Sequence, residues 1–557
     1  MCDVITLRGR TVCDGIAIGK AMLYRREDNL ITRYHIDSIE DEIERFERAR
    51  LQAIDELKTL YSRAVSDVGE ASAEIFNIHQ QMLDDPDYIE SVKNIIANEM
   101  INAETAVGYT CDSFVQMFES ISSAYMRGRD TDVKDISERI ISVLEGKDYR
   151  AIKTTSPVII IADDLTPSET VQLDRKTTLA FVTEKGTSNS HTAILARMMN
   201  IPAIIGVDGI CSGDFDGKDI IVDGSDGAIY IDPDEETIAR MKKKQSEYCE
   251  KIESLSHLRG KESVTADGKK VSLYANIGNV FDVGSAVSGD AEGIGLFRSE
   301  FLYLESYDFP AEDAQFNVYR EVLEKMDGKK VIIRTLDIGA DKRVGYFHMD
   351  EEENPAMGIR AIRVCFEHKD WFKTQLRALY RASVYGRLSI MFPMITSEWE
   401  IDQIFEIINE VKAELDAQGI KYADDIEIGC MIETPAAAII SDDLAKRLDF
   451  LSIGTNDLTQ YSLAADRSNP HIGRYCDYAH KAIFRLIHMV VENAHKHGIR
   501  VGICGEIAAD LDLTQTLLAL GVDGLSVAPG MLLPIRDKIR KTDISSVKDE
   551  ILNKIIN

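Results

Sequence analysis

The chain contains no pair of cysteines at a spacing used for metal binding or thiol redox chemistry. Its nine cysteines are an odd number, and no two of them form a C-x-x-C pair. They are scattered at Cys2, Cys13, Cys111, Cys211, Cys249, Cys365, Cys430, Cys476 and Cys504. This pattern argues against a zinc-ribbon protein and against a disulfide-stapled secreted scaffold, and we expect reduced thiols in a cytosolic protein.

Long apolar runs and an excess of positive charge are also absent. No stretch of about 18 uncharged apolar residues occurs, and the start of the chain lacks a basic segment followed by an apolar one. The chain has 64 Lys and Arg against 94 Asp and Glu, a formal net charge of −30. Because binding to phosphate backbones needs clustered Lys and Arg, this balance argues against a general nucleic-acid-binding protein. We expect a cytoplasmic, unexported protein without membrane insertion.

The first half of the chain has β-prone and helical stretches in a nested order. With 557 residues, of which 45% are hydrophobic, the chain can form three or four domains of about 150 residues. Short β-prone stretches occur in residues 1–32 and return at about residue 158, whereas residues 33–145 have helical spacing, with Ser38 and Asp41 resembling a capping box. We therefore predict a β/α domain of residues 1–32 and 146–233, interrupted by an inserted α-helical subdomain of residues 33–145.

The second half alternates between strand-like and helix-like segments. We expect residues 234–260 to form a charged helical linker, with a solvated helix that has no further role as the alternative, and the region 261–557 follows it. Eight apolar runs in that region are each followed by a helix-like segment; they lie at 271–277, 293–298, 330–336, 388–394, 426–432, 450–454, 500–504 and 524–528. Eight such units predict a (β/α)8 TIM barrel, with a doubly wound open sheet as the alternative.

Polar residues follow most of these predicted strands at their C-terminal ends. They are Asn276, Arg298, Arg334, Asp337, Glu433, Asn456, Asp457, Cys504 and Glu506. One strand instead ends with the apolar Met394. In a barrel these ends converge on one mouth, where active sites lie. Because desolvating so many ionisable groups without a ligand is costly, the pattern predicts a binding or catalytic site.

The residue types at this mouth suit a small anion. Arg298 and Arg334 offer planar cations that bind a carboxylate or a phosphate through two parallel hydrogen bonds. Three more cations, Arg360, Arg467 and Lys342, lie in the loops after the strands. Taken singly, each arginine could instead form an ordinary surface ion pair. Two further residues, Glu433 and Asp457, are a carboxylate pair of the kind that holds Mg²⁺ together with substrate phosphate and water.

Two further residues carry candidate chemistry. Cys504 ends a predicted strand between glycines, where a thiol can act as a general acid, although a buried small apolar role is the alternative. His191 follows Ser190, a predicted N-cap, so it would lie in the first turn of a helix where backbone N–H groups favour an anion. A phosphoryl group on its imidazole would be stabilised there, whereas a capping or surface role is the alternative.

Nine sequence motifs, in register along nearly the whole chain, resemble one family. They are DLTPSET at 164–170, SHTAI at 190–194, EGIGLFRSEFL at 292–302, RTLDIG at 334–339, ENP at 353–355, MFPM at 391–394, ETPAA at 433–437, GTNDLTQY at 454–461 and CGE at 504–506. The chain resembles the phosphoenolpyruvate-protein phosphotransferases, which are enzyme I of the bacterial sugar phosphotransferase system. The resemblance implies a swivelling phosphohistidine domain and a C-terminal barrel.

The resemblance also implies roles for individual residues. His191 would take the phosphoryl group of phosphoenolpyruvate on Nε2, release pyruvate, and pass the group to a histidine of the carrier protein HPr. The implied substrate-binding residues are Arg298, Arg334, Asn456, Asp457 and Arg467. Glu433 and Asp457 would hold Mg²⁺, Cys504 would protonate the enolate carbon, and Thr170, Ser190 and Arg360 would support the site.

Partners are implied in the same way. The barrel would form a homodimer, and the helical subdomain would dock HPr through His79, Met82, Leu83, Tyr125 and Arg129, with ordinary helix-bundle core as the alternative. The family commonly has two glycines and a threonine in the loop before its histidine, whereas this chain has Gly186 and Thr187 and then Asn189. This departure concerns the fine geometry of the loop rather than its chemistry, because Ser190 and His191 are intact.

Two other functions remain as alternatives. A pyruvate-phosphate dikinase or phosphoenolpyruvate synthase would need an additional ATP-grasp domain, for which the chain has no room. A non-catalytic regulatory relative that binds HPr is the other alternative, and the intact His191, Glu433, Asp457 and Cys504 argue against it.

Overall fold

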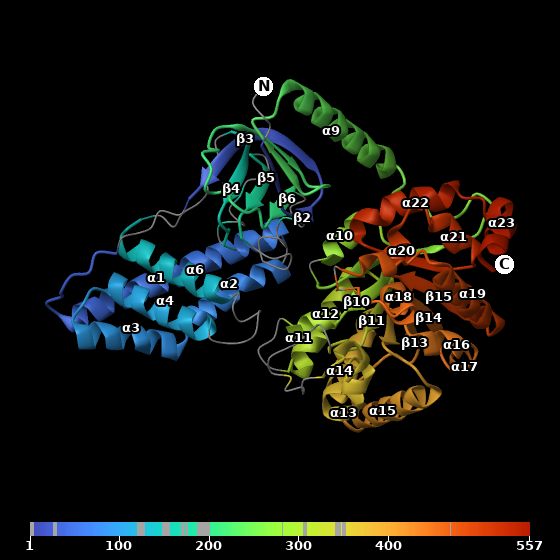
Figure 1. The fold of residues 1–557 in the computed structure, drawn as a ribbon. Helices are drawn as coiled ribbons and strands as arrows, with labels where there is room; N and C mark the ends of the chain where they lie inside the picture. The colour runs from blue at the N-terminus through green and yellow to red at the C-terminus, as the bar shows by residue number, and fades with distance from the viewer. Residues whose placement is uncertain are drawn as a thin grey trace. The chain divides into compact units, whose positions relative to one another are not determined.

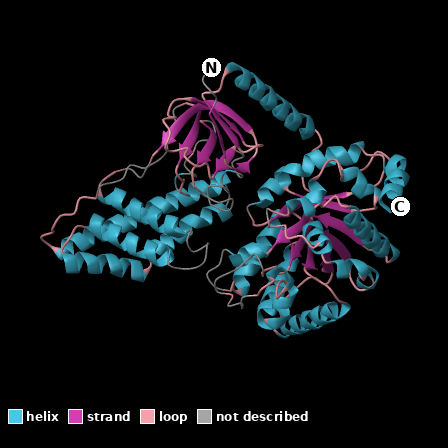
Figure 2. Cartoon of the chain, in the orientation of Figure 1, coloured by secondary structure: helices cyan, strands magenta, loops and turns pink. Residues whose placement is uncertain are grey.

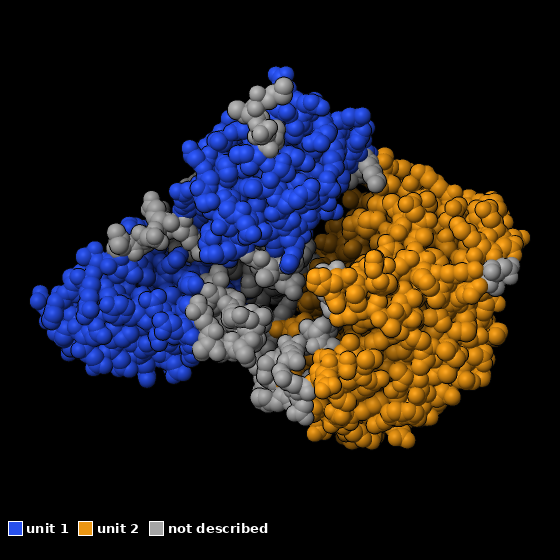
Figure 3. Space-filling view, in the orientation of Figure 1, with its two compact units in different colours: residues 1–252 blue, residues 253–557 orange. Residues whose placement is uncertain are grey.

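The computed structural model divides the chain into two compact units, residues 1–252 and 253–557 (Figure 3). It describes residues 5–25, 31–68, 70–119, 129–147, 156–166, 169, 173, 177–185, 196, 201–280, 282–304, 309–339, 347, 352–467, 469 and 471–556. Within these ranges, no helix combines the length and the apolar character needed to cross a bilayer.

The first unit contains an eight-stranded mixed sheet (Figure 1). Its strands are β1 (Ile5–Arg8), β2 (Arg10–Cys13), β3 (Ile16–Tyr24), β4 (Val158–Ala162), β5 (Thr178–Thr183), β6 (Ala203–Ile205), β7 (Asp219–Asp223) and β8 (Ala228–Ile231), in the order β1-β8-β7-β3-β4-β5-β6-β2. β3 to β6 are parallel neighbours, and the other pairs are antiparallel. Consecutive residues of β4, such as Ile159 and Ile160, point to opposite faces and belong to different buried clusters, so both faces of the sheet are covered.

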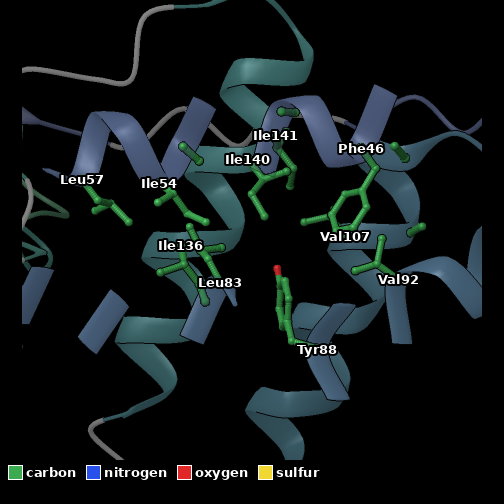
Figure 4. Packing of buried hydrophobic residues seen from close by; sticks show 14 of the residues in the cluster. Phe46, Ile54, Leu57, Leu83, Tyr88, Val92, Val107, Ile136, Ile140 and Ile141 are labelled. Carbon is green, nitrogen blue, oxygen red and sulfur yellow. The ribbon is translucent and has the colours of Figure 1, made fainter. Parts of the chain in front are cut away.

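A helical bundle connects β3 to β4. Its described helices are α1 (Ile39–Val68), α2 (Glu70–Leu83), α3 (Pro86–Glu99), α4 (Ala103–Glu119) and α6 (Arg129–Leu144). The amide of Asp41 donates to Ser38 Oγ at 3.3 Å, which is the first half of the capping box expected from the sequence. The bundle is held by an apolar core to which α1, α3 and α6 contribute Phe46, Tyr88 and Ile140 (Figure 4).

Helix α9 (Glu235–Ser256) follows the sheet, and the first half of the helix packs against it. Met241 is buried beside Ile16 and Ile221, and Gln245 Nε2 donates to the carbonyl oxygen of Ile16 at 2.7 Å. Lys244 also forms ion pairs with Asp223 and Asp226. The predicted charged linker is therefore a helix whose first three turns pack on the first unit.

The second unit is a closed barrel of eight parallel strands surrounded by helices (Figure 2). The strands are β9 (Ser272–Ile277), β10 (Gly293–Arg298), β11 (Lys330–Arg334), β12 (Leu388–Phe392), β13 (Glu427–Ile432), β14 (Phe450–Gly454), β15 (Arg500–Cys504) and β16 (Gly524–Val527). β16 pairs with β9 and closes the ring. The predicted TIM barrel is confirmed, and the open-sheet alternative is wrong.

Helices follow the barrel strands on its outer side. They are α10 (Asp282–Ser288), α11 (Glu300–Leu304), α12 (Glu312–Lys325), α13 (Ile362–Glu367), α14 (Lys369–Ala382), α15 (Glu398–Ala417), α16 (Pro435–Ile439), α17 (Ser441–Ala445), α18 (Thr455–Leu463), α19 (Lys481–Lys496), α20 (Glu506–Ala509), α21 (Thr514–Ala519), α22 (Leu532–Lys541) and α23 (Ile544–Ile556), with 3-10 turns at Pro355–Met357, Ser383–Tyr385, Gly473–Tyr475 and Pro529–Met531. Because every strand runs in the same direction, the C-terminal strand ends share one mouth.

Candidate active site

Arg334 is a buried cation at the end of β11. Only 5% of its surface is exposed, and its Nη2 atom lies 2.7 Å from Glu300 Oε1 and 2.9 Å from Asp337 Oδ2. Burial by itself would lower the pKa of the guanidinium, but the carboxylates of Asp337 and Glu300 hold that pKa above its ordinary value. Arg334 therefore keeps its charge inside the barrel mouth.

Arg360 is a second buried cation, and it shares a counter-ion with the first. Its Nη2 atom donates to Asp337 Oδ1 at 3.0 Å, and its Nη1 atom donates to the Tyr461 hydroxyl at 3.1 Å. The carboxylate of Asp337 thus holds Arg334 with one oxygen and Arg360 with the other. Two planar cations are fixed side by side, which suits a ligand with more than one negative charge.

Glu433 lies directly after β13 with 1% of its surface exposed. The amide of Met394 donates to its Oε1 atom at 2.7 Å. Burial, followed by the nearby charges of Asp457 and Asp337, raises the pKa of Glu433 to about 8 against the opposing effect of Arg334. A bound cation would reverse this cost, because it favours the ionised carboxylate.

Asp457 lies in the first turn of α18, near Arg360 and Arg467. It is 7% exposed, and its Oδ1 atom lies 3.9 Å from Arg360 Nη1 and 3.8 Å from Arg467 Nη2. Oδ1 is buried and accepts no hydrogen bond from the described parts of the chain. Since a buried carboxylate oxygen without such a bond is costly, this atom is a candidate ligand for a cation.

The remaining predicted substrate residues lie at the same mouth. Arg298 ends β10 with an exposed side chain, and its guanidinium lies over the Phe301 ring, 4.9 Å from the centroid. Asn456 precedes Asp457, and its Oδ1 atom accepts the amide of Glu506 at 3.2 Å. Arg298 and the partly exposed Arg467 can move towards a ligand more freely than the buried pair.

Cys504 ends β15 and is almost fully buried. Its Sγ atom lies 3.6 Å from the Ser452 hydroxyl and 3.6 Å from the carbonyl oxygen of Ile453. Burial is the main cause that raises the pKa of this thiol to about 11. Cys504 is therefore a protonated thiol near neutral pH, which is the form that a proton donor requires.

The predicted phosphate-accepting segment lies outside the described residues. His191, Ser190 and Thr170 belong to it, as do Thr187 and Asn189, and Lys342 of the barrel lies outside as well. Of the residues shortly before Thr170, Thr166 and Glu169 are described, and they form reciprocal hydrogen bonds. The amide of Thr166 donates to Glu169 Oε2 at 2.7 Å, and the amide of Glu169 donates to Thr166 Oγ1 at 3.2 Å.

The predicted docking residues on α2 are unequally placed. His79 and Leu83 have no exposed surface, and Leu83 lies in the bundle core (Figure 4), whereas Met82 is half-buried. Side chains without exposed area cannot touch a docked protein in this conformation, so the core alternative describes His79 and Leu83. Tyr125 lies outside the described residues, and Arg129 begins α6 with a side chain that is not described.

Polar neighbours of the site were missed in the sequence analysis. Glu300 and Ser452 were not singled out. Glu300 lies only two residues after Arg298. Ser452 lies two residues after Phe450 and so faces the same side of the strand, and Phe450 belongs to the buried cluster that contains Cys504. Strand alternation could have placed Ser452 in the barrel interior. The pairing of Glu300 with Arg334 joins the start of α11 to the end of β11 and has no local signal.

No group of three or more His, Cys, Asp and Glu side chains is positioned to hold a metal ion within the ranges that the structure describes. The mouth instead offers a pair, Glu433 and Asp457. A pair of carboxylates is a normal protein contribution for Mg²⁺, which keeps water and takes further oxygens from substrate phosphate.

Three family models match the chain in succession. They are described as PEP-utilising enzyme, N-terminal, over residues 8–129; PEP-utilising enzyme, mobile domain, over residues 154–227; and PEP-utilising enzyme, PEP-binding domain, over residues 253–544. The third match contains the whole barrel mouth, and the second contains the position of His191.

Full-length relatives agree with these matches. The phosphoenolpyruvate-protein phosphotransferase of Priestia megaterium is 43% identical over 551 residues, which are 98% of this chain and 96% of that protein. The protein of the same name from Bacillus subtilis (strain 168) is 41% identical, over 98% of this chain and 97% of that protein.

A solution NMR structure of an Enzyme I protein is 36% identical and covers 43% of this chain and 99% of that chain, with a TM-score of 0.38.

Proposed function

The chain belongs to the phosphoenolpyruvate-protein phosphotransferase family, the enzymes I of the phosphotransferase system, and on that premise we propose how its residues perform the reaction. As an enzyme of this family it catalyses phosphoryl transfer that depends on phosphoenolpyruvate. In the proposal the barrel mouth binds phosphoenolpyruvate, and His191 accepts the phosphoryl group and passes it to HPr.

The pair of buried arginines is the observation that carries the proposal. Asp337 holds Arg334 and Arg360 as neighbouring buried cations at the mouth. Phosphoenolpyruvate carries a phosphate and a carboxylate on the same carbon atom of one small molecule, so two fixed guanidinium groups match it in number and sign. Arg298, Arg467 and Asn456 would complete the binding of the substrate.

Glu433 and Asp457 fit Mg²⁺ as the family's metal. The fit rests on the buried Asp457 Oδ1 atom without a hydrogen bond from the described residues, and on the raised pKa of Glu433, both of which a divalent cation would relieve. When bound, Mg²⁺ neutralises charge on the phosphate and on the leaving enolate oxygen. Arg334 and Arg360 add fixed positive charge at the same place.

Cys504 would complete the chemistry of the leaving group. As the P–O bond breaks, the enol oxygen of the substrate takes the bonding electrons, and the resulting enolate has a nucleophilic methylene carbon. Cys504 is protonated near neutral pH because its pKa is raised to about 11. Transfer of the Sγ proton to that carbon gives pyruvate and leaves a thiolate.

His191 would connect the two half-reactions. Its Nε2 atom takes the phosphoryl group from the substrate and later gives it to a histidine of HPr, with Thr170 orienting the ring and Ser190 capping the helix start. The proposed domains are residues 1–32 with 146–233, 33–145, 234–260 and 261–557. A swivel about the segment 234–260 would let His191 reach both partners.

Two further parts of the proposal concern assembly and location. We place the enzyme in the cytoplasm as a homodimer through its barrel. No disulfide joins two cysteines among the residues that the structure describes, which suits a reducing compartment. HPr would dock on the helical subdomain, where Met82 has exposed surface.

Phosphate mapping tests the proposal directly. The purified chain is incubated with phosphoenolpyruvate labelled on phosphorus and with Mg²⁺, and the acid-labile label is located by peptide mapping before and after HPr is added. We expect label on His191, its transfer to HPr, and no label in His191→Ala, while His257→Ala behaves like the parent. Label at another residue would overturn the site, and failure to release pyruvate would favour a regulatory relative.

A further inference from the structure

The thiol of Cys504 has two polar partners, and they differ in the hydrogen bonds that they can make. Cys504 ends β15 and Ser452 lies on the adjacent strand β14. Ser452 is 4% exposed, and its hydroxyl donates to Cys504 Sγ at 3.6 Å. The carbonyl oxygen of Ile453, also at 3.6 Å, accepts from the thiol.

These two partners respond in opposite ways when the thiol loses its proton. A thiolate cannot donate to the Ile453 carbonyl, whose oxygen would then repel it. The Ser452 hydroxyl can still donate, and a hydrogen bond to a charged group is stronger than one to a neutral group. The other charges that act on Sγ oppose each other, since Arg334 favours the thiolate and Glu433 disfavours it.

We propose that Ser452 is a positioning residue that stabilises the thiolate formed on Cys504 during protonation of the enolate. The proposal rests on the function proposed above. In this step the S–H bond breaks and its electron pair stays on sulfur, while the π electrons of the enolate form the new C–H bond and the enolate oxygen becomes the carbonyl of pyruvate. Ser452 donates its hydrogen bond to sulfur until a proton from solvent restores the thiol.

The loss of this hydroxyl has a defined kinetic consequence. In Ser452→Ala we expect protonation to slow by about tenfold to hundredfold, because a hydrogen bond to a charged group is removed. Phosphorylation of His191 precedes this step and is expected to keep the parent rate. An enolate that waits longer can leave the enzyme and be protonated in water.

The test separates the two steps in a single turnover of the full chain. Phosphoenolpyruvate that carries deuterium at one defined position on its methylene carbon is used in tritiated water. Both the rate of phosphohistidine formation and the rate and methyl configuration of pyruvate formation are measured. Protonation on the enzyme gives one configuration, whereas protonation in water gives a mixture. We expect one configuration from the parent and from Ser452→Thr, which keeps the hydroxyl, and a mixture from Ser452→Ala.

The matched control is Ser389→Ala. Ser389 is also a buried serine on a barrel strand, but its hydroxyl donates to Glu427 at the opposite, N-terminal end of the strands. It is expected to behave like the parent in both measurements. If phosphorylation of His191 and protonation of the enolate slowed to the same extent in Ser452→Ala, the role of Ser452 would be structural and the proposal would be overturned.

Two other outcomes are distinguishable. A single configuration formed at the parent rate by Ser452→Ala overturns the role of Ser452 alone. A single configuration formed by Cys504→Ala shows instead that another group donates the proton, which overturns the assignment of Cys504 in the proposed function.

Discussion

The backbone amide of Met394 donates a 2.7 Å hydrogen bond to Oε1 of Glu433, so the chain after β12 fixes a carboxyl group that follows β13. Met394 adopts a φ of 58°, in the left-handed region that is uncommon for a residue with a side chain. Backbone strain of this kind persists where the surrounding structure holds it, and it is frequent at functional sites. The bond occupies Oε1 of Glu433 and leaves Oε2 as the oxygen available to a cation.

Glu433→Gln should stabilise the metal-free protein as pH rises. The folded-state pKa is raised to about 8 from its ordinary value of 4.5, so between these values the folded chain binds more protons than the unfolded chain. Stability is therefore lost as pH increases through this window. The glutamine variant lacks this loss, and we expect it to exceed the parent by about 1–2 kcal/mol at pH 8 and by little at pH 5.

Calorimetry of the barrel transition across this pH range provides the measurement. The exposed Glu398→Gln on α15 is the control and should follow the parent. Added Mg²⁺ should raise the melting temperature of the parent more than that of Glu433→Gln. An equal difference between parent and variant at pH 5 and pH 8 would contradict the buried-charge explanation.

Asp337→Asn should destabilise the barrel and be partly rescued by substrate. Removing the carboxylate leaves Arg334 and Arg360 buried without their shared counter-ion, which we expect to cost about 3 kcal/mol. Phosphoenolpyruvate with Mg²⁺ would supply negative charge to the same guanidinium groups. In a His191→Ala background, where no transfer occurs, adding substrate should reduce the loss of melting temperature that Asp337→Asn causes.

The control for this experiment is Asp313→Asn. Asp313 forms an exposed ion pair with Arg381 on α14, so its loss should change stability by less than about 1 kcal/mol and show no substrate effect. A rescue of equal size in both variants would refute a specific role for Asp337.

Gly454→Ala should impair catalysis because β14 approaches Glu433 closely. A Cβ atom at residue 454 would lie 3.0 Å from Glu433 Oε2 and 2.9 Å from Met431 Sδ. The carboxylate must then shift by a few tenths of an ångström, and we expect kcat/KM for phosphoenolpyruvate to fall by about tenfold or more. Gly502→Ala on the neighbouring strand is the matched control, since its nearest contact would be 3.8 Å and activity should be kept.

Met82→Ala and Leu83→Ala should separate docking from folding on α2. Leu83 has no exposed surface in the bundle core, so its truncation should lower the free energy of unfolding by about 2–5 kcal/mol. Met82 is half-buried, so its truncation should weaken HPr binding in calorimetric titration with a smaller loss of stability. Unchanged HPr affinity in a folded Met82→Ala protein would remove Met82 from the docking surface.

Most of the fold was predictable because its signals are local. The eight apolar runs of the barrel coincide with β9 to β16 within two residues at each end, since a buried parallel strand is a continuous apolar run. In the first unit, residues 16–18 and 22–24 are two β-prone stretches with Gly19 between them in the sequence, yet both belong to the single strand β3. Glycine weakens a strand but does not end one when both flanking segments are paired.

The site was predictable only in part. Residues at the ends of parallel strands share one edge, so Arg334, Glu433, Asp457 and Cys504 could be grouped from sequence. Which charges pair across strands depends on packing distances, and neither the Glu300 contact with Arg334 nor the division of Asp337 between two arginines follows from spacing. Likewise, the burial of His79 beside Asp132 is a tertiary property.

The parallel pairing of β3 with β4 determines how the helical bundle could be removed or exchanged. Parallel neighbours cannot be joined by a hairpin, because the connection must run from the end of one strand back along its full length to the start of the next. A minimal version of the first unit would therefore need a replacement connection of about a dozen residues, long enough to return along the sheet. A foreign helical module grafted there must have termini spaced to suit that path.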